Sequence, residues 1–188
     1  MLARSFRELL GRKTLIAGDV GSGKTQMAVE LLKEAVSLGY GPQITVIDTA
    51  PATTVVKGKK VGGKIADLTD ATRQVRYLAP ERVEAPRLSA ETPEHLLRLV
   101  ALNKSRIDEA IGAYLSEPTK ILFVNDISMY FQSGSAEPVL EAAKKAETFI
   151  ANGYYGQYLA HDQGAGVSEV ERRLMDHLAK HMDEVIRL

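Results

Sequence analysis

The chain has 188 residues, a length that favours one α/β domain with a sizeable core, so we expect residues 1–188 to form a single domain. Its 24 lysines and arginines equal its 24 aspartates and glutamates, which excludes a global field that would attract nucleic acid or an anionic membrane. The absence of cysteine excludes disulfides, thiolate catalysis and cysteine-ligated zinc.

Short apolar segments alternate with segments of helical periodicity, which is typical of a parallel sheet covered on both faces. The predicted strands, in chain order, are residues 14–17, 44–47, 75–78, 120–124 and 155–160. The predicted helices are residues 23–38, 92–115, 135–150 and a last one from a Ser168–Glu171 capping box onward. We therefore expect a three-layer α/β/α fold with a mainly parallel five-stranded sheet.

The most specific motif lies between the first predicted strand and the first predicted helix. It reads G-x-x-x-x-G-K-[ST] and comprises Gly18, Asp19, Val20, Gly21, Ser22, Gly23, Lys24 and Thr25. Its glycines allow successive backbone N–H groups to face a phosphate, and the following helix presents the positive end of its dipole. We expect these residues and Gln26 to bind nucleotide phosphates, with Lys24 at the β and γ phosphates and Thr25 on Mg²⁺.

A second motif follows the predicted strand at residues 120–124. Asn125 and Asp126 come directly after its apolar residues, so Asp126 would lie at the ligand-binding edge of the sheet. We expect Asp126 to hold Mg²⁺ opposite Thr25, although an acid that merely caps the strand end is an alternative.

The two motifs together resemble the P-loop NTPase superfamily, with its RecA-like branch favoured. Gly18–Thr25 is similar to the Walker A element and Asp126 to the Walker B element, while no narrower family is indicated. The resemblance implies a P-loop NTPase fold and binding of ATP with Mg²⁺. Many hydrolysing members have a glutamate directly after the Walker B aspartate, where this chain has Ile127. The group that activates water must then come from elsewhere, or hydrolysis is slow.

Asp48 is the candidate that we favour for that role. It ends the predicted strand at residues 44–47, and in RecA-like ATPases an acid at this place can polarise the attacking water. The alternative is that Asp48 opens a turn and accepts a backbone N–H. Polar residues after the last predicted strand, His161 and Gln163, are weaker candidates for sensing the γ-phosphate.

Four lysines lie between Lys57 and Lys64, interleaved with glycines. Such a segment could contact an anionic second substrate or a polynucleotide, or it could be a solvated loop without a ligand. Base preference is indicated only by Asn103, which begins a sequence similar to the guanine-reading N-K-x-D but lacks its aspartate. ATP is therefore favoured over GTP.

The sequence thus predicts a P-loop NTPase that binds and hydrolyses MgATP. Two alternatives stay open: a small-molecule or nucleotide kinase, and a nucleotide-gated binding module with little turnover. A homo-oligomer is also open, because RecA-like sites often borrow an arginine from a neighbour. We expect a cytoplasmic protein without membrane contact, since residues 1–6 lack the apolar run of a signal peptide and no stretch of about 18 apolar residues occurs.

Overall fold

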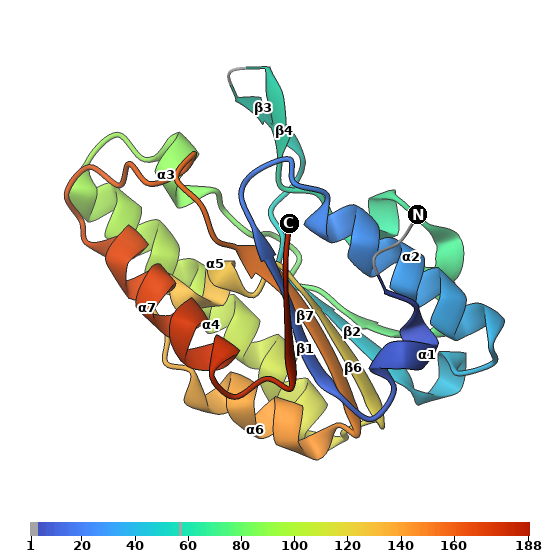
Figure 1. Ribbon diagram of the computed structural model, residues 1–188. Coiled ribbons are helices and arrows are strands. Elements are labelled where there is room, and N and C mark those ends of the chain that lie inside the picture. The colour runs from blue at the N-terminus through green and yellow to red at the C-terminus, as the bar shows by residue number, and fades with distance from the viewer. Residues whose placement is uncertain (1–3, 57) are drawn as a thin grey trace.

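A parallel six-stranded sheet with the strand order β5-β2-β6-β7-β1-β8 forms the centre of the protein. The computed structural model describes residues 4–56 and 58–188. The strands of the sheet are β1 (Lys13–Gly18), β2 (Ile44–Asp48), β5 (Arg76–Leu78), β6 (Ile121–Asn125), β7 (Thr148–Tyr154) and β8 (Glu184–Arg187). Two further strands, β3 (Thr54–Val56) and β4 (Lys59–Val61), form an antiparallel hairpin that projects from the body (Figure 1).

Helices cover both faces of this sheet (Figure 1). One face carries α1 (Phe6–Leu9) and α2 (Lys24–Ser37), and the other carries α4 (Pro93–Ser116), α5 (Ser128–Phe131), α6 (Glu137–Lys145) and α7 (Val167–Ala179). The short helices α3 (Pro86–Ser89), η1 (Gly41–Gln43), η2 (Ile65–Asp67) and η3 (Asp70–Gln74) lie in the connections.

Alternate residues of the central strands supply two separate apolar cores. Ile16 and Phe123 pack with α1 and α2, whereas their neighbours Leu15, Leu122 and Val124 pack with the helices of the other face. Burial on both faces explains why these strands read as continuous apolar runs in the sequence. Among the described residues, no helix is both long and apolar enough to cross a membrane.

Parallel pairing brings the carboxyl ends of the strands to one edge of the sheet, where α/β proteins bind ligands. Strand β7 lies between β1 and β6 and pairs with both. The loop after β1 and the turn after β6 therefore face each other across the end of β7, close to the base of the hairpin.

The sequence-based element assignment was wrong around residue 150. The predicted helix at 135–150 ends as α6 at Lys145, and its last part belongs to β7. The predicted strand at 155–160 is a loop. Short apolar runs do not separate strand from buried helix, and Asn152-Gly153, interpreted as a helix stop, lies inside the buried strand.

Three further differences follow from tertiary contacts. The sheet has six strands instead of five, because β8 adds an edge to β1 that short local patterns do not indicate. The hairpin β3–β4 occupies part of the predicted lysine segment. The capping box at Ser168 and Glu171 is wrong, because α7 begins after Gly166 in the left-handed conformation and Glu171 points inward to Arg87.

Candidate functional site

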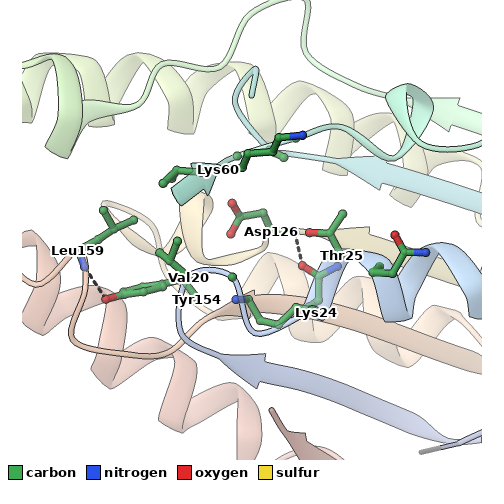
Figure 2. Close-up of a pocket in the computed structure, with 15 residues that line it drawn as sticks. Val20, Lys24, Thr25, Lys60, Asp126, Tyr154 and Leu159 are labelled. Carbon is green, nitrogen blue, oxygen red and sulfur yellow. Dashed lines mark hydrogen bonds between the residues drawn. The ribbon is translucent and has the colours of Figure 1, made fainter. Parts of the chain in front are cut away.

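A cavity of about 260 Å³ opens at the carboxyl edge of the sheet. Four parts of the chain line it: the loop after β1 with the start of α2, the turn after β2, the end of β6 together with the end of β7 and the loop that follows β7, and β4 with the two glycines after it. Figure 2 shows Lys24 and Thr25 on one side of this cavity, Lys60 on the other side, and Asp126 between them.

The loop between β1 and α2 turns at two glycines. Gly21 and Gly23 have φ angles of 75° and 95°, a region that residues with a side chain rarely adopt. Lys24 folds over the loop and donates to the Asp19 carbonyl at 2.6 Å. Burial lowers the pKa of Lys24, and the carboxylates of Asp126 and Asp19 oppose that change. The ammonium group is thus held at the cavity, where an anion would compete with the carbonyl for it.

Most of the residues predicted to bind phosphates do line the cavity, and these are Val20, Gly21, Gly23, Lys24, Thr25 and Gln26. Gly18, Asp19 and Ser22 do not. Sequence reasoning had placed all eight motif residues at the ligand without separating lining residues from those that shape the loop.

Asp19 is one of the residues that shape the loop. Its carboxylate accepts hydrogen bonds from the backbone N–H groups of Val20, Gln157 and Tyr158, at 2.6, 2.9 and 3.3 Å. The pKa of Asp19 is lowered because these hydrogen bonds outweigh the opposing effect of burial. A Cβ atom at Gly156 would overlap the Asp19 carboxyl group, so only glycine permits this approach. Asp19 therefore fastens the loop to the segment after β7.

Asp126 lies at the end of β6 with a φ of 58°, which is uncommon for a residue other than glycine. The conformation is held by contacts to three side chains. Asn152 accepts the Asp126 N–H at 3.1 Å, Ser128 donates to the Asp126 carboxylate at 2.6 Å, and Thr49 donates to the Asp126 carbonyl at 2.6 Å. These three hydrogen bonds together keep the Asp126 carboxylate at the cavity that Thr25 also lines.

The donor set at this position fits Mg²⁺. Thr25 supplies a hydroxyl and Asp126 a carboxylate, and the described residues contain no cluster of three or more histidine, cysteine, aspartate or glutamate side chains. Mg²⁺ is usually bound through one or two carboxylates together with waters and substrate phosphates. Burial raises the pKa of Asp126, while Ser128 and Lys24 favour its charged form.

Asp48 is fully buried and does not line the cavity. One carboxylate oxygen accepts from Asn125 at 2.8 Å and from the Ala50 N–H at 3.2 Å. The other accepts from the Tyr77 hydroxyl and the Ile65 N–H, both at 2.7 Å. Burial raises the pKa of Asp48, and these hydrogen bonds oppose the rise. The Ala50 contact is the one expected of an acceptor in the turn after β2, and the four donors occupy the lone pairs that a water would need.

A row of buried amides connects Asp48 to the cavity. Asn125 donates to Asp48, Asn152 donates to Asn125 at 2.9 Å, and Asn152 accepts the N–H of Asp126. Because Asn152 was assigned to a helix end, its place at the cavity was missed. Tyr154, the last residue of β7, was missed because it fell between that helix end and the strand predicted from residue 155.

The hairpin closes the cavity opposite the loop. Lys60, on β4, is exposed and lines the cavity together with Val61, while the Lys64 ammonium donates to the Pro80 carbonyl at 3.0 Å. Lys57 and the side chain of Lys59 lie outside the described residues. The Tyr158 hydroxyl donates to the Val56 carbonyl at 2.8 Å, which ties the hairpin to the segment that Asp19 holds.

The weaker candidates lie elsewhere. Gln163 donates to the Ala90 carbonyl at 2.7 Å, and neither it nor His161 lines the cavity. Asn103 lies within α4 and binds both the N–H and the carbonyl of Glu84, a structural role for its amide.

Comparison with known proteins leaves the chain without an assigned family. No protein-family model and no curated protein matches it. Among solved structures, a Pif1 helicase from Candida albicans is similar at a TM-score of 0.38 and 13% sequence identity. That match covers 95% of this chain, which spans 36% of the helicase chain. The likeness is too remote to transfer the helicase's activity to this chain.

Proposed function

We propose that the chain is a P-loop NTPase of the RecA-like branch, which works as one domain, binds MgATP and hydrolyses its terminal phosphoanhydride bond. The observation that carries the proposal is that Lys24, Thr25 and Asp126 line one cavity at the start of a helix. A cation, a hydroxyl and a carboxylate in this arrangement suit a polyphosphate with its magnesium ion.

Each group has a defined role in this proposal. The N–H groups of the loop bind phosphate oxygens, and Lys24 stabilises the charge that develops on the transferred phosphoryl group. Thr25 and Asp126 hold Mg²⁺, which when bound neutralises charge on the β and γ phosphates. Asp19 keeps the loop in shape from behind, through its contacts to Gln157 and Tyr158.

The space next to Asp126 can hold the water that hydrolysis needs. A second cavity there has only about 40 Å³ and adjoins the first. One water needs about 10–15 Å³ of such space, so this cavity accommodates water.

Lys60 supports the proposal of an anionic partner at the hairpin. Its side chain is exposed at the rim of the cavity, and the neighbouring strand is joined through Tyr158 to the nucleotide loop. A polynucleotide or an anionic second substrate on this hairpin would therefore affect, and respond to, nucleotide binding. This connection also supports the binding-module alternative, in which nucleotide occupancy changes the hairpin without rapid turnover.

The decisive experiment measures phosphate release from ATP and GTP with Mg²⁺, together with nucleotide binding. We expect turnover with ATP that falls at least about 100-fold in Lys24→Ala, because the developing charge loses its main cation. Lys33→Ala is the matched control, since Lys33 is an exposed lysine of the same helix that pairs with Glu30. Normal turnover by Lys24→Ala would refute the proposal.

The same assay separates the alternatives. Adding candidate acceptors with a hydroxyl group tests the kinase, which would release ADP only when an acceptor is present. Adding single-stranded polynucleotide tests the hairpin, where stimulation that is lost in Lys60→Ala is expected. Tight ATP binding with negligible phosphate release under all these conditions would favour the binding module.

A further inference from the structure

Lys24, Thr25 and Asp126, in their proposed roles, leave the attacking water without a residue that positions it. Ile127 occupies the place of the usual glutamate and is buried in the apolar core. Asp48 has four hydrogen-bond donors around its carboxylate and lies outside the cavity. Asp126 is assigned to Mg²⁺. If the protein hydrolyses ATP, another group must orient the water.

Gln132 meets the requirements for that group. It follows α5, its side chain is only 3% exposed, and it lines the 40 Å³ cavity next to Asp126. Its amide nitrogen donates to Glu171 at 3.0 Å, whereas its amide oxygen has no hydrogen-bond partner among the described residues. A buried carbonyl oxygen without a donor is costly, so this atom has unused capacity to accept a hydrogen bond.

Such an atom is rare in this protein. Within the part of the chain that the structure describes, the only other buried side-chain polar atom without a partner is the hydroxyl of Thr14. Thr14 lies near the start of β1, at the opposite end of the strand from the nucleotide loop. The unpaired oxygen of Gln132 is thus the one that belongs to a residue of the site.

A buried ion pair fixes which way the Gln132 amide points. The two terminal nitrogens of the Arg87 guanidinium donate to the Glu171 carboxylate, at 3.0 and 2.9 Å, and both side chains are at most 5% exposed. An ionised carboxylate can only accept, so the NH₂ group of Gln132 must face Glu171 and the oxygen must face away from it. A rotated amide would set two acceptors against each other.

The 40 Å³ cavity, which Gln132 lines, adjoins the proposed nucleotide site. The two cavities share Val61, Gly62, Asp126, Tyr154 and Leu159. A water in the smaller cavity would therefore lie beside Asp126, next to the space proposed for the phosphates. The volume is sufficient for a water, as hydrolysis requires.

We propose that Gln132 orients the attacking water, with its side-chain oxygen as hydrogen-bond acceptor and with Glu171 and Arg87 as positioning residues. This inference rests on the proposed ATP hydrolysis. The water oxygen forms a bond to the γ-phosphorus, and the bond from that phosphorus to the β–γ bridging oxygen breaks. Its electron pair stays on ADP. An amide is too weak a base to take a proton, so the proton of the water passes to a phosphate oxygen and leaves with inorganic phosphate.

Gln132→Met tests this role with the least change of shape. Methionine has a similar length and no amide, and the Arg87–Glu171 pair stays intact. We expect the rate of phosphate release at saturating ATP to fall about 100-fold, the scale of losing one positioned group in proton transfer. The dissociation constant for MgATP should change less than about twofold, since only the water loses a contact. Gln43→Met, at an exposed position in η1, is the control.

A crystal structure with Mg²⁺ and a non-hydrolysable ATP analogue provides a readout other than activity. We expect an ordered water about 3 Å from the Gln132 oxygen and beside the γ-phosphate in the wild type, and its loss in Gln132→Met. A wild type that binds nucleotide but releases no phosphate would overturn the hydrolysis itself. An active wild type whose turnover survives Gln132→Met, or a water held by other side chains alone, would overturn the role of Gln132 and leave hydrolysis standing.

Discussion

Replacing Asp48 by asparagine separates a structural carboxylate from a catalytic one. The change keeps the shape of the side chain but puts an NH₂ group where one oxygen accepts two donors. In one orientation of the new amide, its NH₂ group faces the Tyr77 hydroxyl and the Ile65 N–H. In the other orientation it faces the Asn125 NH₂ group and the Ala50 N–H, so buried donors oppose each other in both cases. Hydrogen bonds to charged groups contribute about 1.5–3 kcal/mol each, so losing one or two of them costs about 3 kcal/mol.

That loss is measurable in two independent ways. Urea denaturation should give a free energy of unfolding lowered by about 3 kcal/mol, and the melting temperature should fall by about 6–12 °C for a chain of this size. Phosphate release by the folded variant should stay within about tenfold of the wild type, because the lost contacts act on the strand ends and not on the water. Unchanged stability with turnover lowered more than about 100-fold would refute this reasoning and restore Asp48 as the water-activating group.

Two further predictions concern the metal and the loop. Burial raises the pKa of Asp126, and Mg²⁺ needs the ionised form, so MgATP affinity should weaken as pH falls through that raised pKa, by at most about tenfold per pH unit. Titration calorimetry should show that MgATP affinity depends less steeply on pH in Asp126→Asn than in the wild type. The titration of the nucleotide itself is common to both proteins, so equal pH profiles would contradict the assignment of Asp126 to Mg²⁺. Gly156→Ala should lower both ATP affinity and the melting temperature, by about 1–3 kcal/mol of stability, because its Cβ overlaps the Asp19 carboxyl. Gly112→Ala, whose Cβ meets nothing, should do neither.

The fold class could be predicted because local patterns in this chain agree with its tertiary structure over most of its length. Strands β1, β2 and β6 are apolar runs bounded by turn residues, and α4 begins with Thr92 as its N-cap and Pro93 in its first turn. The assignment failed where the signal was ambiguous. Strand β7 contains Asn152 and Gly153, which in isolation indicate a turn, yet the amide of Asn152 is paired within the sheet edge.

The candidate site was only partly predictable for a related reason. A loop that binds phosphates uses neighbouring residues, so Lys24 and Thr25 share one motif that a sequence reader can find. Asp48 shows the limit of such reading: a strand-end acid has the same appearance in the sequence whether it faces a cavity or, as here, four internal donors. Burial decides between these roles, and burial is a property of the folded chain.

The proposed water site could not be predicted from any local pattern. Gln132 and Glu171 are 39 positions apart, and Arg87 is 84 positions from Glu171. They meet only because α3, α5 and α7 gather on one side of the strand ends. A glutamate directly after Asp126 would be recognisable in the sequence as part of the motif. An amide that is oriented by an ion pair between distant residues has no such local pattern. If Gln132 orients the water, the absence of a glutamate after Asp126 does not mean that the water lacks a positioning residue. The residue that follows α5 then supplies this function.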